Sequence, residues 1–270
     1  MPRVKAHNLT INYDQQGIGE PLILIPYLAA DHACYAFQVA EYSKYFTCIS
    51  LDLRGTGESD ASPGEYSTEV LADDVAAFMR ALGISRAHVS GLSLGAAVGM
   101  WLAAKNPEMV ASLSLHSGWP KSDPYLKAVV ESFQVMARSL GNIADVVIRG
   151  MFPWCLTPEL YAAKPEYVQA LAEFVRSRPA QSVASFLQQT NAVIAHDAEG
   201  QVSKIEAPTQ ISFGRLDTAT SLRFGDRLKT IQNSELLVFE GCSHAPIYEN
   251  VAEFNEKTLQ FLKRHTFGSQ

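Results

Sequence analysis

The sequence predicts an α/β fold with a mostly parallel central sheet, helices on both faces of the sheet and an inserted helical cap. Short apolar runs alternate along the chain with segments of helical spacing, which is typical of a parallel sheet. The alternation stops between Trp119 and Val202, where only helical patterns occur. The 270 residues suffice for one large domain with an inserted lobe. We therefore assign residues 1–118 and 203–270 to the core domain and residues 119–202 to the cap.

The first strands and the first helix are expected before residue 52. Residues 9–13 alternate between apolar and polar side chains and predict an edge strand. Pro21–Pro26 and Phe46–Leu51 are continuous apolar runs, as expected of strands that are buried on both faces. Residues 36–44, which separate these two runs, have helical spacing.

The next part of the chain repeats the alternation. Thr68 is the expected N-cap of a helix that runs to about Leu82, with its apolar side chains on one face. Ala87–Val89 is a short apolar run, which predicts a buried strand, and the small residues 96–104 after it predict a helix. Val110–Leu115 predicts the strand that precedes the cap.

Helices dominate the cap, and strands return after it. The helical patterns of the cap cover residues 123–140, 158–167, 167–176 and 180–194. In the last part of the chain, Thr209–Gly214 and Glu235–Phe239 predict two strands, with a helix at about residues 221–232 between them. A final helix is expected over about residues 250–264.

Composition excludes several classes of protein. The net charge is −6 and Lys and Arg do not cluster, so a nucleic-acid-binding surface is not expected. The sequence has no run of about 18 apolar residues, so a membrane span is not expected. It has no apolar segment near Met1, so a secretory signal is not expected. The four cysteines lie far apart without a C-x-x-C pair, so neither disulfides nor a zinc site is expected. These features favour a cytoplasmic protein.

Gly91–Gly95 fits the pattern G-x-S-x-G between an expected strand and an expected helix. A serine at such a sharp turn takes a strained backbone conformation, and the glycines allow the strand and the helix to approach closely. The turn exposes the Ser93 hydroxyl and directs the Leu94 amide at the same space. The alternative is a tight turn that carries an ordinary surface serine.

A serine nucleophile needs a base, and the base needs an acid. His244 lies in a small-residue loop after the last strand, at the sheet edge where Ser93 is expected. His116 and His196 are alternative pocket residues. Asp217 follows the strand Thr209–Gly214 and is the expected acid. The other position for an acid, directly after Leu115, carries no carboxylate in this sequence.

Backbone amides are expected to bind the oxyanion that forms when serine attacks a carbonyl carbon. One is the Leu94 amide. The second is expected in the loop after the strand Pro21–Pro26, and we assign it to Leu28, with Tyr27 as the alternative. The alternative role for both residues is that of pocket wall.

Taken together, these residues resemble the α/β-hydrolase superfamily. The resemblance covers nearly the whole chain outside the cap and includes a typical loop, D-x-R-G-x-G-x-S, formed by Asp52, Arg54, Gly55, Gly57 and Ser59. Residues 21–120 look most like 3-oxoadipate enol-lactonases and related carboxylesterases. Many members have His-Gly where this chain has Pro26-Tyr27. Serine rather than aspartate at position 93 argues against haloalkane dehalogenase and epoxide hydrolase chemistry.

The resemblance implies a serine hydrolase for carboxylic esters or lactones, acyl-homoserine lactones among them, that needs no metal or cofactor. The cap and the loop after Pro26 should supply the substrate pocket. The candidates are Tyr27, Met151, Phe152, Trp154, Phe174, Phe186 and Leu187. Three arginines could pair with a substrate carboxylate: Arg149, Arg176 and Arg178. The expected partner is a small molecule, and the chain is expected to be a monomer or a homodimer. The alternatives are a cofactor-free perhydrolase or haloperoxidase-like hydrolase, and a ligand receptor on the same scaffold.

Overall fold

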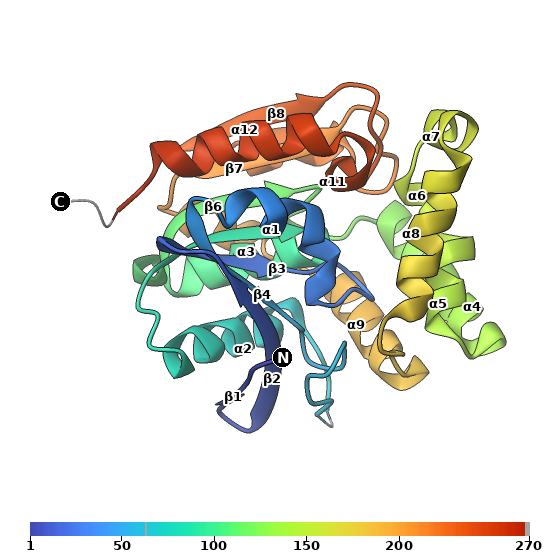
Figure 1. Cartoon of the computed structure of the whole chain (residues 1–270), viewed down its shortest axis with the longest axis horizontal. Helices are drawn as coiled ribbons and strands as arrows, with labels where there is room; N and C mark the ends of the chain where they lie inside the picture. Colours follow the sequence, from blue (N-terminus) through green and yellow to red (C-terminus); the bar gives the residue numbers. More distant parts are fainter. Residues whose placement is uncertain (63, 268–270) are drawn as a thin grey trace.

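An eight-stranded sheet forms the centre of the molecule (Figure 1). A computed structural model describes residues 1–62 and 64–267. The strands lie in the order β1-β2-β4-β3-β5-β6-β7-β8, and all neighbours from β4 onward are parallel, whereas β2 runs antiparallel to β1 and β4. The strands are β1 Arg3–Ala6, β2 Leu9–Gln16, β3 Glu20–Ile25, β4 Phe46–Leu51, β5 Ala87–Leu92, β6 Val110–His116, β7 Thr209–Gly214 and β8 Ser234–Phe239.

Helices cover both faces of the sheet, because alternate side chains of the buried strands point to opposite sides. Leu22 and Leu24 of β3 belong to a cluster with the helices α1, Ala36–Tyr42, and α12, Val251–Arg264. Ile23 and Ile25 belong to the main core cluster, which includes α2, Thr68–Ala81, and α3, Leu94–Lys105. In Figure 1, α12 lies at the top of the view and α2 at the bottom.

Two details of the first half differ from the sequence prediction. The strand at residues 9–13 is not at the edge, because β1 pairs with β2 on its outer side. β1 is short and largely exposed, so its sequence carries no pattern of burial. The N-cap of α2 is Ser67 rather than Thr68: the Ser67 hydroxyl accepts the Val70 amide at 3.1 Å.

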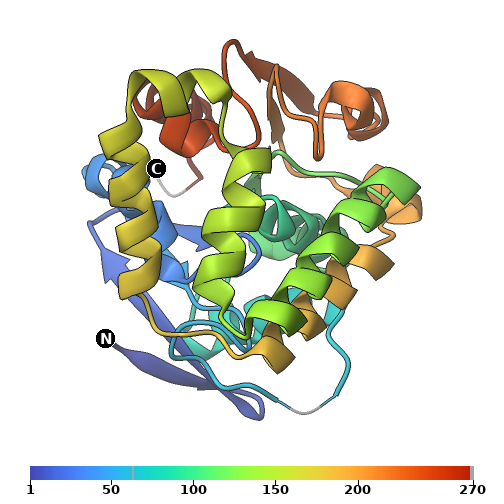
Figure 2. The ribbon, with the colours of Figure 1, turned by 90° about the vertical axis from the view of Figure 1, so that its right-hand side faces the viewer.

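Between β6 and β7 the chain forms a set of helices that we call the cap helices, on the right of Figure 1 and facing the viewer in Figure 2. The expected helix at 158–167 is broken at Lys164, since Pro165 begins a new helix. The cap helices are α4 Pro124–Leu140, α5 Ile143–Val146, the π-helical turn Val147–Met151, α6 Phe152–Cys155, α7 Pro158–Ala163, α8 Pro165–Ser177 and α9 Val183–Ala195.

The segment after β7 is less helical than predicted. The expected helix at 221–232 is only a 3₁₀ turn, Leu222–Phe224, followed by the short helix α10, Gly225–Leu228. A turn ends it, in which Ile231 donates its amide proton to the Leu228 carbonyl. The remaining short elements are the 3₁₀ turns His32–Tyr35, Pro107–Met109 and Glu199–Lys204 and the helix α11, Pro246–Glu249. In the part of the chain that the structure describes, no helix combines the length and the apolar composition needed to cross a membrane.

His196 connects the end of α9 to the core. Its Nε2 lies 3.0 Å from the Trp119 carbonyl oxygen, to which it must donate, so Nδ1 accepts a proton from the Thr68 hydroxyl at 2.7 Å. The side chain is buried, and burial lowers the pKa of His196 to about 4. The folded protein therefore keeps this imidazole neutral well below the pH at which an exposed histidine becomes charged.

This pKa predicts a pH dependence of stability. Between the unfolded value of about 6.5 and the folded value of about 4, the unfolded chain binds a proton at His196 that the folded chain does not, so acidification destabilises the fold. His196→Gln should remove about 1.4 kcal/mol per pH unit from the slope of the unfolding free energy, measured with urea between about pH 7 and about pH 4.5. His7→Gln, at an exposed position, is the control. Equal slopes in the two variants would contradict the assignment.

Candidate active site

The candidate site lies at a reversal of strand order. From β3 the chain continues to β4 on one side, whereas β5 and the later strands are added on the other side. The carboxyl ends of parallel strands leave a crevice at such a point. Ile25 of β3 pairs with Gly91 of β5, so the loop after Ile25 and the turn at Ser93 lie next to each other.

Ser93 occupies a strained turn between β5 and α3. Its backbone angles are φ 55° and ψ −115°, a conformation that side-chain-bearing residues rarely adopt. The Ser93 amide donates to the His116 carbonyl of β6 at 2.8 Å, which ties the turn to the neighbouring strand. Leu94 is the first residue of α3, so its amide has no acceptor within the helix and remains available at the helix N-terminus.

The two glycines of the pattern allow this turn to form. A Cβ atom at Gly91 would lie 2.2 Å from the Gly95 carbonyl oxygen, and one at Gly95 would lie 2.1 Å from the Ile25 carbonyl oxygen. Backbone atoms cannot move away from such contacts at low cost. Glycine is therefore required at both positions for β5, α3 and the end of β3 to meet.

Asp217 and His244 meet where the loops after β7 and β8 lie side by side. The Asp217 Oδ2 atom lies 2.9 Å from the His244 Nδ1 atom. The loops after β7 and β8 pack backbone against backbone, because a Cβ at Gly214 would lie 1.9 Å from the Ser243 carbonyl oxygen. The Leu216 amide also donates to the Cys242 carbonyl at 2.9 Å.

The Asp217 carboxylate is almost completely buried yet well supplied with donors. The Ala219 and Thr220 amides donate to Oδ1 at 2.8 Å and 3.0 Å, and the Thr220 hydroxyl lies 2.9 Å from Oδ2. Burial by itself raises the pKa of Asp217, but the attraction of the His244 charge and these hydrogen bonds outweigh it, so the pKa lies below its usual value. The carboxylate is thus negative when it faces His244.

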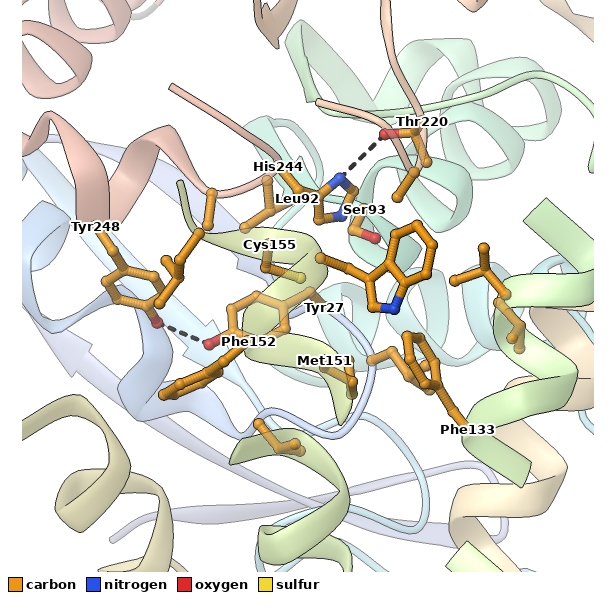
Figure 3. Close-up of a pocket in the computed structure, with 18 of the residues that line it drawn as sticks. Tyr27, Leu92, Ser93, Phe133, Met151, Phe152, Cys155, Thr220, His244 and Tyr248 are labelled. Carbon is orange, nitrogen blue, oxygen red and sulfur yellow. Dashed lines mark hydrogen bonds between the residues drawn. The ribbon is translucent and has the colours of Figure 1, made fainter. Parts of the chain in front are cut away.

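Figure 3 shows Ser93 and His244 side by side in one cavity. One ring nitrogen of His244 points toward Thr220, and the other lies on the side of Ser93. Because Nδ1 is engaged with Asp217, the nitrogen available to Ser93 is Nε2. The structure thus brings the three side chains predicted from the sequence to one place, in the order serine, histidine, aspartate.

The hydroxyl of Tyr27 is already engaged. The Tyr248 hydroxyl donates to the Cys34 carbonyl at 2.8 Å, so in its 2.8 Å contact with Tyr27 it must accept. Tyr27 therefore uses its only hydroxyl proton on Tyr248 and has none for a ligand. Leu28 lines the same cavity as Ser93, so its backbone amide stays the candidate for the second oxyanion donor.

Five of the seven predicted pocket residues line this cavity: Tyr27, Met151, Phe152, Trp154 and Phe174. The prediction for Phe186 is wrong. Its side chain is fully buried in the main core and does not line the cavity. The prediction for Leu187 is also wrong, because Leu187 does not line the cavity either. The sequence reasoning missed one face of α4, whose spacing by three and four residues was a usable signal: Leu126, Val129, Val130 and Phe133. It also missed Thr220 and Tyr248.

The cavity wall carries no carboxylate, ammonium or guanidinium group among the described residues. Arg178 pairs with Asp31 at 2.8 Å, and Arg149 lies 3.8 Å from Asp145. Neither they nor Arg176 line the cavity. His116 and His196, the alternative histidines, also lie outside the cavity wall, so His244 is its imidazole.

One buried group has the composition of a metal site. The ligand atoms of Asp31, His32 and Asp52 lie within 4.8 Å of one another. However, Asp31 binds Arg178, and Asp52 Oδ1 accepts from both the amide and Nδ1 of His32 at 2.7 Å. These atoms stabilise the loops after β3 and β4, and we assign no metal to them.

Comparison with known proteins agrees with the fold. The sequence profile of the alpha/beta hydrolase fold family matches residues 20–251. The chain is 25% identical over 265 residues to a protein of Azorhizobium caulinodans named "Putative carbamate hydrolase RutD", covering 97% of this chain and 98% of that one. It is 27% identical over 262 residues to 3-oxoadipate enol-lactonase 2 of Acinetobacter baylyi, covering 96% and 95% of the two chains.

A solved structure is similar over the same length. The enol-lactonase from Burkholderia xenovorans LB400 superposes with a TM-score of 0.87 at 25% sequence identity, covering 97% of this chain and all of that one. The similarity includes the region of the cap helices as well as the sheet, because nearly the whole chain is covered.

The contact at Gly95 predicts the effect of a single methyl group. Gly95→Ala places its Cβ against the carbonyl oxygens of Ile25 and Pro26, so the loop that carries Tyr27 and Leu28 must shift. We expect the unfolding free energy, measured by urea denaturation, to fall by about 1–3 kcal/mol. Gly200→Ala is the control, because a Cβ there meets no atom within 4 Å. Equal stability of the two variants would show that the contact is not tight.

Proposed function

The chain belongs to the α/β-hydrolase family, and from this premise we propose that it is a serine hydrolase that cleaves carboxylic esters or lactones through an acyl-enzyme on Ser93. The observation that carries the proposal is the arrangement of Asp217, His244 and Ser93 at one apolar cavity. Asp217 binds Nδ1 of His244 at 2.9 Å, and Ser93 lies on the side of Nε2. A serine hydroxyl becomes a useful nucleophile when such a base can take its proton.

In the first step, Nε2 of His244 removes the Ser93 hydroxyl proton as Oγ forms a bond to the carbonyl carbon of the substrate. The carbonyl oxygen becomes an oxyanion, to which the Leu28 and Leu94 amides donate. Asp217, held by two backbone amides, stabilises the imidazolium that forms. The bond to the leaving oxygen then breaks, and Nε2 returns the proton to that oxygen.

In the second step, His244 removes a proton from water, and the hydroxide attacks the acyl carbon. The bond to Ser93 Oγ breaks, the acid leaves, and the serine proton is restored. With a lactone, the alcohol stays attached to the acyl group, so the product is a hydroxy acid. A carbamate has the same acyl carbon with nitrogen attached, and a substrate of that class would follow the same steps.

The first test is Ser93→Ala, which removes the attacking oxygen. We expect kcat/KM on p-nitrophenyl butyrate to fall by about 10⁴-fold or more. Ser132→Ala, at an exposed position on α4, should retain the wild-type rate. Rapid-quench mass spectrometry of the wild type should show the butyryl group on the peptide that contains Ser93. Undiminished hydrolysis by Ser93→Ala would overturn the acyl-enzyme proposal, and peroxide added to the assay tests the perhydrolase alternative.

The cavity wall favours a substrate with an uncharged acyl group. Aliphatic and aromatic side chains, many of them from α4, α6 and α8, form most of the wall, and the arginines that could bind a carboxylate lie elsewhere. When one carboxyl group of 3-oxoadipate forms the enol-lactone ring, the other carboxylate stays free and charged. Burying that charge without a partner is costly. We therefore infer a neutral ester or lactone, and acyl-homoserine lactones are among the substrates to assay.

This inference can be tested with two substrates that differ only at the far end of the chain. p-Nitrophenyl hexanoate should be hydrolysed at least about 100-fold more efficiently, as kcat/KM, than the p-nitrophenyl monoester of adipic acid, because the latter brings an unpaired carboxylate into the apolar wall. Ser93→Ala gives the background for both. Equal rates, or a preference for the charged ester, would contradict a neutral acyl site and favour an enol-lactonase activity of the 3-oxoadipate type.

A further inference from the structure

The Thr220 hydroxyl lies among three polar groups beside the candidate nucleophile. Its Oγ1 atom is 2.9 Å from the Ser117 carbonyl oxygen, 2.9 Å from Asp217 Oδ2 and 3.2 Å from His244 Nδ1. The side chain is buried and borders the cavity, and Figure 3 shows it above the His244 ring. Three loops, which follow β6, β7 and β8, thus meet at one hydroxyl group.

The hydroxyl group has one proton, and its position can be deduced. The Ser117 carbonyl and the Asp217 carboxylate can only accept, and both are closer to Oγ1 than the imidazole nitrogen is. The proton therefore goes to one of these oxygens, and an Oγ1 lone pair is left toward His244 Nδ1. Thr220 acts on the imidazole as an acceptor.

This arrangement determines which ring nitrogen carries the proton. If Nδ1 were unprotonated, its lone pair would face the Asp217 carboxylate at 2.9 Å and the Thr220 oxygen at 3.2 Å, and the three would repel one another. With a proton, Nδ1 donates to Asp217 and shares that proton with Thr220. Nε2 is then unprotonated and can accept the proton of Ser93.

We propose that Thr220 is a positioning residue, which together with Asp217 holds His244 in the tautomer with the proton on Nδ1. The inference rests on the proposed function of His244 as the base. Thr220 acts twice: its amide donates to the Asp217 carboxylate, and its hydroxyl oxygen is the second acceptor for the imidazole proton.

Ser117 completes the arrangement from the other side. Its hydroxyl donates to the His244 backbone carbonyl at 2.9 Å, and its own carbonyl lies 2.9 Å from the Thr220 hydroxyl. Ser117 has φ 49°, and its amide donates to the Ser212 carbonyl at 2.7 Å, so the residue is held in an uncommon conformation. The Ser117 carbonyl competes for the Thr220 proton and keeps it away from Nδ1.

The kinetic test compares three variants. Thr220→Val keeps the branched shape and removes the hydroxyl, and kcat on p-nitrophenyl butyrate should fall on the order of ten- to a hundredfold, with KM changed by less than about threefold. Thr220→Ser restores the oxygen and should stay within about threefold of wild type. Thr218→Val is the matched control, because Thr218 is exposed and its hydroxyl takes no part in the contact between Asp217 and His244. Wild-type kcat in Thr220→Val would overturn the proposal.

A spectroscopic test follows the tautomer itself. NMR of the protein labelled with ¹⁵N-histidine should show the His244 proton on Nδ1 in wild type, Thr220→Ser and Thr218→Val. The resonance of this proton should lie far downfield, because the proton is in the hydrogen bond to Asp217. In Thr220→Val that resonance should broaden or disappear, and the Nε2-protonated form should become populated. An unchanged spectrum in a folded Thr220→Val protein, checked by its melting temperature, would overturn the inference.

The two proposals fail separately. If Ser93→Ala is inactive and Thr220→Val is fully active, only the role of Thr220 is wrong. If Ser93→Ala retains activity, the acyl-enzyme proposal is wrong, and the NMR spectra still decide whether Thr220 holds the His244 tautomer.

Discussion

The close backbone contact between β5, α3 and the end of β3 is the constraint on which the candidate site depends. Gly91 and Gly95 have no side chain, so carbonyl oxygens occupy the space that a Cβ would fill. This contact forces Ser93 into its strained turn and brings the loop with Leu28 beside it. The turn is stable because strands on both sides bury it, and the packing of the sheet offsets the local strain.

A second backbone contact places His244. The end of β7 and the loop after β8 touch at Gly214 and Ser243, which sets Asp217 opposite His244. The loop after β6 adds Ser117, whose hydroxyl holds the His244 backbone. The polar groups that follow the parallel strands β6, β7 and β8 thus lie at one edge of the sheet, as the geometry of parallel sheets requires. None of these groups lies on the cap helices.

The cap helices contribute a different property. Their side chains toward Ser93 are apolar, and the charged side chains of Arg149 and Arg178 pair with carboxylates outside the cavity. The sheet edge therefore carries the candidate reactive groups, while the cap helices supply much of the apolar wall of the cavity. Relatives with different named activities match nearly the whole chain at about a quarter sequence identity.

The sequence by itself determined the features that depend on neighbouring residues: the apolar runs of β4 and β7 at their observed bounds, the turn at Ser93, and the loops with Asp217 and His244. The local pattern sufficed because a strand that is buried on both faces is a continuous run of apolar residues, which the sequence shows directly. The tertiary structure decided what depends on distant residues. It set β1 outside β2, turned Phe186 into the core, and placed the Thr220 hydroxyl between Ser117 and His244. Those contacts join segments far apart in the chain, and no local pattern records which segments meet.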